Sequence, residues 1–315
     1  MVKWIKKRAR LLAQIGFAAI TNGYFPGFAR GTIYKGNSKA VCVPGLNCYS
    51  CPGALGSCPI GALQATLGDR NYHFAFYVVG FLLVFIPVML AEWVLGKFAP
   101  NKKAISSLRI VQGTFKLILK ITGVETVVIG EENVPTDTAV LYVGNHRSFF
   151  DILLTYSRCP RLTGYVAKKE MEKIPLLSTW MRYLHCLFLD RKDIKEGLKT
   201  ILLGIEKMKS GISICIFPEG TRNKGDNELE LLPFHEGSFK LATKSGCPII
   251  PIAMNNTAEI FEAHFPKITK TKVVIEYGAP IYPEQLSRQE QKRLGQYVQG
   301  KILEMLVKNQ ELVKK

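Results

Sequence analysis

Residues 139–151 read AVLYVGNHRSFFD, and the change of character within this stretch decides the predicted fold. The run Ala139–Gly144 is apolar and rich in the residue types that favour a buried strand. His146 follows in a polar turn, and a helical pattern begins near residue 150. A strand that ends in polar residues ahead of a helix is typical of α/β folds, which present their reactive groups at that edge of the sheet.

The alternation of strand and helix continues along the chain. Short β-rich runs recur at Glu125–Ile129, Ala139–Gly144, Gly164–Ala167, Cys186–Leu189, Ser213–Phe217, Ile249–Ala253 and Val273–Tyr277, with helical patterns at 150–158, 175–184, 193–209 and 236–245. The stretch 283–308 carries four aliphatic residues at four-residue spacing, Leu294, Val298, Ile302 and Leu306, so we expect one apolar helix face to cover the sheet. The sequence therefore predicts an α/β fold with a central, mostly parallel sheet flanked by helices.

The composition changes near residue 97, which predicts an N-terminal membrane region at 1–96 and a second domain at 97–315. The chain has 315 residues, a formal net charge of +17 and a mean hydropathy of +0.10. Nucleic acid, anionic lipid and phosphorylated substrates would each satisfy that charge. Because the hydropathy favours lipid, we expect anionic membrane lipids as partners and no nucleic acid.

Two apolar segments lie in the first region. Phe74–Ala91 has no charged residue, and as a helix of about 27 Å it would match the hydrocarbon core of a bilayer; a buried helix of a soluble protein is the alternative. Leu11–Ala29 is interrupted by polar residues, glycines and a proline, so it is either a span or an interfacial piece. Both the N-terminus and residues 97–120 are basic. We therefore expect a cell-membrane protein whose second domain faces the cytoplasm.

His146 and Asp151 form the first candidate for chemistry. In an ideal helix, residues five apart point about 140° from each other, so these two meet only if His146 precedes the first turn and Asp151 lies within it. A carboxylate there would fix the imidazole tautomer and leave the other ring nitrogen to remove a proton from a hydroxyl. The alternative is a structural or chance pairing.

The second candidate is the turn after the strand in SICIFPEGTRNKG, residues 213–225. Backbone N–H groups, a hydroxyl and a guanidinium come together at Gly220, Thr221 and Arg222, a combination suited to phosphate. Glu219 would either orient the arginine or bind a substrate hydroxyl. The alternative is an ordinary turn with a surface arginine.

Together these stretches resemble the glycerolipid (lysophospholipid) acyltransferase family. NHRSFFD fits the NHxxxxD motif of that family, and FPEGTR fits its acceptor-phosphate motif. YLHCLFLDR, which ends at Arg191, and CPIIPIAM, at 247–254, resemble two further blocks, and Lys168 recurs in the bacterial enzymes. The resemblance covers roughly residues 97 to 310.

The resemblance implies a 1-acyl-sn-glycerol-3-phosphate acyltransferase. Such an enzyme moves an acyl group from acyl-CoA or acyl carrier protein to the sn-2 hydroxyl of lysophosphatidate, giving phosphatidate in phospholipid synthesis, and needs no cofactor. It implies His146 as general base, Asp151 as its partner, and the acceptor held by Glu219–Arg222, Arg191 and Lys168. Another lysophospholipid, or glycerol 3-phosphate, is the alternative acceptor.

A cysteine cluster in the first region points elsewhere. Cys42, Cys48, Cys51 and Cys58 have the spacing C-x5-C-x2-C-x6-C, which suits a 4Fe-4S cluster or a structural zinc. The segment CPIGALQ resembles part of the membrane-bound 4Fe-4S binding proteins, but the second cysteine run of that family does not follow. Cluster, zinc, disulfide and no metal all stay open. The competing function is therefore a membrane electron-transfer protein with an attached acyltransferase-like domain.

Overall fold

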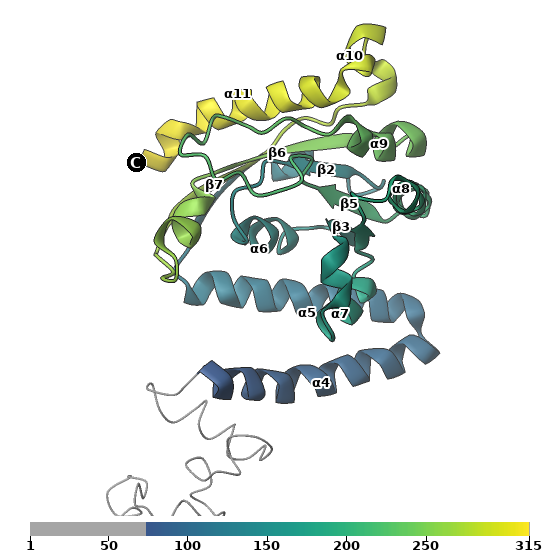
Figure 1. Cartoon of the computed structure of the whole chain (residues 1–315), viewed down its shortest axis with the longest axis vertical. Coiled ribbons are helices and arrows are strands. Elements are labelled where there is room, and N and C mark those ends of the chain that lie inside the picture. The colour runs from purple at the N-terminus through teal and green to yellow at the C-terminus, as the bar shows by residue number, and fades with distance from the viewer. Residues whose placement is uncertain (1–73, 315) are drawn as a thin grey trace, which may run out of the picture. The chain divides into compact units, whose positions relative to one another are not determined.

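The computed structural model describes residues 74–314, with side chains from 85 to 313 (Figure 1). The described chain divides into two units between Val94 and Leu95, two residues from the predicted domain boundary. The unit that begins at Leu95 holds a seven-stranded sheet with the order β1-β7-β6-β2-β5-β3-β4. Its strands are β1 (Glu125–Ile129), β2 (Leu141–Gly144), β3 (Thr163–Lys168), β4 (Leu187–Leu189), β5 (Ser213–Ile216), β6 (Ile249–Asn255) and β7 (Lys272–Tyr277). Each of the seven predicted strands is present within two residues of its expected ends.

The sheet is mostly parallel, as predicted. Strands β6, β2, β5, β3 and β4 run in one direction, whereas β7 pairs antiparallel with β6 and parallel with β1. Parallel neighbours require crossover helices, and α6 (Phe150–Tyr156), α7 (Leu177–Tyr183), α8 (Ile194–Lys209) and α9 (Lys240–Ser245) supply them. The carboxyl ends of the five co-directional strands consequently meet at one edge, where α/β proteins place their sites.

Helix α11 (Leu294–Lys314) covers one face of the sheet, and α6 lies on the other (Figure 1). The predicted apolar stripe of α11 is confirmed: Leu294, Val298, Ile302 and Leu306 are at most 2% exposed and belong to the main core cluster. Each such side chain contributes about 1.5–3 kcal/mol on burial. The predicted helix at 283–308 is nevertheless broken, because Ser287 caps the short α10 (Arg288–Lys292) before α11 begins.

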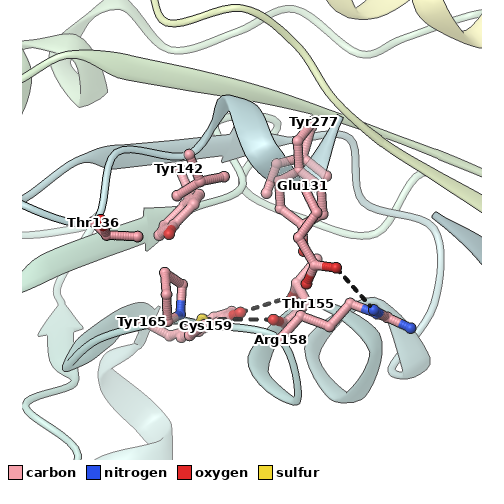
Figure 2. A pocket seen from close by; sticks show the side chains of 11 residues that line it. Glu131, Thr136, Tyr142, Thr155, Arg158, Cys159, Tyr165 and Tyr277 are labelled. Carbon is pink, nitrogen blue, oxygen red and sulfur yellow. Dashed lines mark hydrogen bonds and ion pairs between the residues drawn. The ribbon is translucent and has the colours of Figure 1, made fainter. Parts of the chain in front are cut away.

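The opposite face encloses a cavity of about 230 Å³ between the sheet and α6 (Figure 2). Its walls are mainly aromatic and aliphatic, and Tyr142, Tyr165 and Tyr277 all contribute. The Tyr142 hydroxyl is buried and has no hydrogen-bond partner among the described residues. Burial raises the pKa of Tyr142 above its usual range, so this phenol stays neutral.

Helix α5 (Pro100–Ile121) contains most of the basic stretch at 97–120. Pro100 stands at the first helical position, where its missing N–H costs nothing. The buried side contains Leu108 and Val111, and lysines, an arginine and exposed aliphatic residues share the other side. The basic stretch is therefore an amphipathic helix.

Helix α4 (Phe74–Phe98) covers the apolar segment predicted to span a membrane. In the portion of the chain that the structure describes, no helix has both the length and the apolar character needed to cross a bilayer. The predicted span at 74–91 is thus not confirmed. The second predicted segment, Leu11–Ala29, lies outside the described residues.

The second domain contains four cysteines, Cys159, Cys186, Cys215 and Cys247. Cys159, Cys215 and Cys247 are buried, Cys186 is half-buried, and all four are free thiols. Burial raises the pKa of Cys159 to about 12 and that of Cys186 to about 11. The thiols of Cys159 and Cys186 are therefore protonated and unreactive near neutral pH.

A half-buried imidazole links the fold to pH. His185, at φ 59°, precedes β4, and its Nδ1 lies 3.5 Å from Lys207 Nζ. Burial, with added repulsion from Lys207 and Lys103, lowers the pKa of His185 to about 4. The unfolded chain therefore binds a proton near pH 6.5 that the folded chain does not accept until about pH 4, so this histidine's contribution to stability is lost as the pH falls through that window.

We expect His185→Asn to flatten the pH dependence of stability between pH 6.5 and 4. Asparagine tolerates positive φ but does not titrate. Between pH 6.5 and 4, the free energy of unfolding of wild type should fall by roughly 1–2 kcal/mol more than that of the variant. This figure allows for solvent screening of the half-exposed ring. Denaturant titrations at several pH values measure it, with His235→Asn at an exposed position as the control. Equal slopes for wild type and His185→Asn would contradict the assignment.

Candidate active site

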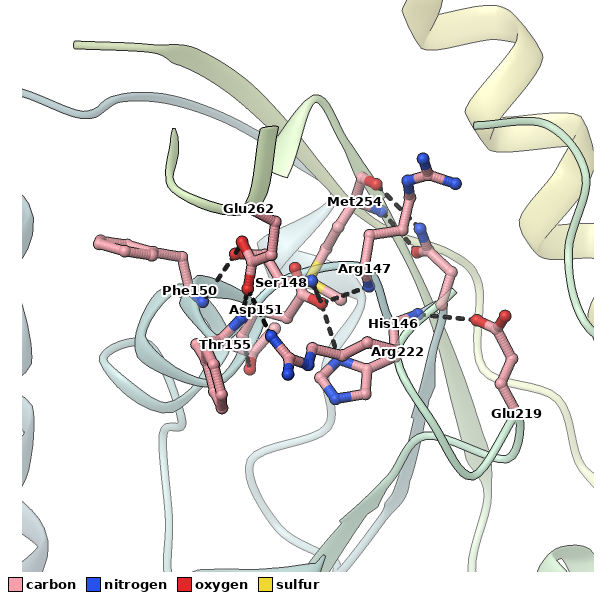
Figure 3. Close-up of polar contacts among 12 residues, drawn as sticks. His146, Arg147, Ser148, Phe150, Asp151, Thr155, Glu219, Arg222, Met254 and Glu262 are labelled. Carbon is pink, nitrogen blue, oxygen red and sulfur yellow. Dashed lines mark hydrogen bonds and ion pairs between the residues drawn. The ribbon is translucent and has the colours of Figure 1, made fainter. Parts of the chain in front are cut away.

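The site lies where the neighbouring strands β2 and β5 end. Leu141 pairs with Ile214 and Val143 with Ile216 in parallel register. Two loops therefore emerge side by side, and one carries His146 while the other carries Glu219–Arg222 (Figure 3). The structure thus brings together the two stretches that the sequence singled out separately.

The first loop is held by its own side chains. Asn145 is buried, and its amide exchanges two hydrogen bonds of 2.9 Å with the backbone of Met254 on β6. Arg147 reaches to the carbonyl oxygens of Gly225 and Asn227. Neither residue was singled out from the sequence, although both belong to the quoted stretch. They anchor the backbone on either side of His146.

His146 and Asp151 are in direct contact. His146 Nδ1 lies 2.8 Å from Asp151 Oδ2, and the carboxylate can only accept, so Nδ1 carries the proton. His146 sits before α6 and Asp151 in its first turn, which is the one arrangement that the spacing permits. The His146 side chain is 15% exposed and Asp151 is completely buried.

Asp151 also organises the loop between them. The same oxygen, Oδ2, accepts the backbone N–H groups of Arg147 and Ser148, both at 2.8 Å. Oδ1 is buried and has no hydrogen-bond partner among the described residues. One carboxylate oxygen therefore fixes both the imidazole and the backbone that carries it.

The His146 ring is fixed on its flat side by an aromatic ring. Phe217 stacks on it at a centroid distance of 4.3 Å and an interplanar angle of 12°. With Nδ1 engaged, Nε2 has no hydrogen-bond partner in the described part of the chain. A neutral imidazole with Nε2 available is prepared to accept a proton from a bound hydroxyl.

Glu219 differs from its predicted role. Its Oε1 accepts the backbone N–H of His146 at 2.7 Å, and its Oε2 accepts that of Leu232 at 3.1 Å. The side chain is 5% exposed, and burial raises its pKa despite these two bonds. Because both oxygens face backbone amides, Glu219 joins the two loops and does not point toward a substrate hydroxyl.

The predicted phosphate turn is tightly packed against Arg191. Gly220 has φ +76°, and an added Cβ would lie 2.5 Å from Arg191 Nη1. Arg191 donates to the Gly220 carbonyl oxygen, so one of its edges is already engaged. Thr221 is exposed, and Lys168 is exposed at the end of β3.

Arg222 has two partners, neither of which was foreseen. Its Nη1 lies 2.9 Å from Glu262 Oε1, and its Cζ lies 3.7 Å from the ring centroid of Phe149. Glu262 belongs to a short helix, η8 (Glu262–His264), that follows β6 by several residues. No sequence pattern links this glutamate to the arginine forty positions earlier.

The cysteine cluster, Cys42, Cys48, Cys51 and Cys58, lies outside the described residues. Within the described part of the chain, no three histidine, cysteine or acidic side chains converge on a possible metal site. The 4Fe-4S assignment therefore stays a prediction.

Comparison with known proteins agrees with the geometry. The Acyltransferase family model matches residues 125–255, which include both loops. The 1-acyl-sn-glycerol-3-phosphate acyltransferase of Saccharomyces cerevisiae is 29% identical over 58% of this chain and 60% of its own length. The enzyme of that name from Helicobacter pylori is 32% identical over 61% of this chain and 81% of its own.

A solved structure shows the same fold. The 1-acyl-sn-glycerophosphate (LPA) acyltransferase of Thermotoga maritima superposes with a TM-score of 0.62 and 26% identity, over 74% of this chain and 92% of that one. The chain spans about 60% of the length of the yeast relative, but more than three-quarters of the two bacterial ones. These matches do not favour the electron-transfer alternative. Since a relative over 30% identical is covered across most of its length, and the site geometry agrees, the chain belongs to the 1-acyl-sn-glycerol-3-phosphate acyltransferase family.

Proposed function

We propose that the protein transfers an acyl group from acyl-CoA or acyl carrier protein to the sn-2 hydroxyl of lysophosphatidate. One observation carries the proposal: His146 is bonded through Nδ1 to a buried Asp151, and its Nε2 is left available beside the loop that holds Arg222. A base next to a cation suits an acceptor that carries both a hydroxyl and a phosphate.

The chemistry follows from these groups. Nε2 of His146 removes the proton of the acceptor hydroxyl while the oxygen attacks the thioester carbonyl carbon. Asp151 stabilises the imidazolium that forms. The tetrahedral intermediate then collapses, the C–S bond breaks, and the imidazolium returns the proton to the leaving thiolate. Ser148 is buried and bonds to Glu262, which supports direct transfer without an acyl-enzyme.

Arg222 is the primary group for the acceptor phosphate. A guanidinium presents planar N–H donors that match phosphate oxygens, and the Arg222 side chain is 28% exposed. Arg191 and Lys168 are the further candidates at the neighbouring strand ends. Glu219 supports the site indirectly, by accepting the backbone N–H of His146.

We further propose that the catalytic domain works against the cytoplasmic side of the cell membrane. On α5, Lys102, Arg109, Lys116 and Lys120 are exposed together with Ile105, Leu117 and Ile121. A cationic face that also carries apolar side chains suits the surface of an anionic leaflet, where a lysolipid acceptor resides.

We expect the double variant Lys116→Glu/Lys120→Glu to lose the advantage that anionic lipid gives to wild-type protein. Each reversed lysine weakens attraction to the leaflet by about 1 kcal/mol or more. The two together should therefore lower the rate at least about thirtyfold on anionic vesicles and little on neutral ones. Lys240→Glu/Lys244→Glu, with the same spacing on α9 across the sheet (Figure 1), is the matched control. Equal losses for the two double variants would contradict a role for α5.

An acceptor panel tests the proposed function itself. Purified full-length protein is given labelled acyl-CoA or acyl carrier protein with lysophosphatidate, glycerol 3-phosphate or other lysophospholipids. We expect phosphatidate from lysophosphatidate as the main product. A clear preference for another acceptor, or no transfer from either donor, would overturn the assignment.

A further inference from the structure

Glu262 stands outside the stretch that matches the family model, yet it lies in the site. The match ends at residue 255, and Glu262 is carried by η8 seven positions later. Its side chain is 21% exposed. The segment that holds it is well anchored, because Thr257 and Ile260 are completely buried.

The carboxylate of Glu262 joins the two loops of the site (Figure 3). Oε1 accepts from Arg222 Nη1 at 2.9 Å and from the backbone N–H of Phe149 at 2.8 Å. Oε2 accepts from the Ser148 hydroxyl at 2.6 Å. Asp151 holds the His146 loop from inside the fold, and Glu262 holds the same loop from the other side while reaching to the second loop.

These contacts fix the plane of the Arg222 guanidinium. One nitrogen is held by Glu262, and one face is covered by the Phe149 ring. Among the described residues, Nη2 and Nε of Arg222 have no hydrogen-bond partner. A planar guanidinium that is held at one nitrogen and covered on one face presents its remaining N–H groups in a defined direction.

We propose that Glu262 is a positioning residue for the acceptor, which acts by holding Arg222 ready for the acceptor phosphate. This inference rests on the proposed function, in which Arg222 binds that phosphate. An unrestrained arginine loses its side-chain freedom when the ligand binds, which weakens affinity. With Glu262 and Phe149 in place, that freedom is lost on folding, and the acceptor meets an oriented guanidinium.

The proposal predicts a selective effect of Glu262→Ala. The apparent KM for lysophosphatidate should rise about tenfold, the scale of one charge-assisted hydrogen bond, while kcat and the KM for the acyl donor stay near wild type. Glu262→Gln keeps an acceptor oxygen for Arg222 and Phe149, so it should restore most of the affinity. Glu259→Gln is the matched control, because it removes a charge from the same segment, in an exposed pair with His264.

A double-mutant cycle with Arg222→Ala decides whether Glu262 acts through the arginine. If it does, Glu262→Ala should add little to the KM of the Arg222→Ala protein. An additive loss, an unchanged KM, or a loss confined to kcat would overturn the proposal. So would a lower KM, which would mean that the carboxylate competes with the phosphate. Wild-type transfer to lysophosphatidate is measured first, so that failure of the function itself is recognised separately. If Glu262→Ala does not fold, Glu262→Ser takes its place with the same expected rise in KM, because serine is too short to reach Arg222.

Discussion

His146→Ala is expected to lower kcat for acyl transfer by about a thousandfold, within the range that a general base contributes. The imidazole is the group that takes the proton from the acceptor hydroxyl, and in the described structure no other side chain occupies that position beside Phe217. Transfer is measured as phosphatidate formed at saturating donor and acceptor. The KM values should change little, because the imidazole is not assigned to either binding site.

The variant loses the hydrogen bond to Asp151 and the stack on Phe217. It should nevertheless remain folded and bound to membranes, because Asp151 Oδ2 keeps its two bonds from the backbone N–H groups of Arg147 and Ser148. A thermal melt and a vesicle sedimentation assay check this. His235→Ala is the control, because His235 is an exposed imidazole that follows the second loop. Normal phosphatidate formation by folded His146→Ala protein would falsify the mechanism.

Arg222→Ala is expected to raise the apparent KM for lysophosphatidate by about a hundredfold. The variant removes a charged donor to the phosphate, a loss of about 1.5–3 kcal/mol. The apparent KM of Arg222→Lys should lie between those of wild type and Arg222→Ala, because an ammonium group keeps the charge but lacks the planar set of N–H donors. Initial rates measured over a range of lysophosphatidate concentrations, at a fixed concentration of the acyl donor, give this KM.

The donor provides the internal control for this second variant. Its KM should be unchanged, since the acyl thioester is not expected to contact Arg222. A rise confined to the donor KM would assign the arginine to the coenzyme or carrier-protein phosphate. The loss of the ion pair with Glu262 has little effect on stability, because both side chains are partly exposed.

The sheet could be predicted almost completely because its strands are local. Each one is a short run of buried β-favouring residues bounded by turns, and periodicity reports burial directly. The stripe on α11 was found for the same reason. Helix α5 was harder to assign, because a run rich in lysine is compatible with either a linker or a charged helix face, and packing on Leu108 and Val111 decides between them.

The candidate site was predicted in part. The pairing of His146 with Asp151 could be predicted because the two residues are five positions apart and a helix begins between them, and both features can be read from the sequence. The orientation of Glu219 toward backbone amides depends on where Leu232 returns in space. Glu262 depends on a contact across forty positions, and no periodic pattern encodes such a contact.

The way Asp151 is bound has a consequence for which sequences can occupy this loop. Its oxygen is held by the main-chain N–H groups of Arg147 and Ser148 and not by their side chains. Any residue with an amide hydrogen can supply these bonds, so the dyad places no demand on side-chain identity there. Proline lacks that hydrogen and is excluded at both positions. Which other residues are tolerated between His146 and Asp151 therefore depends on the side chains that pack against the loop, above all Glu262.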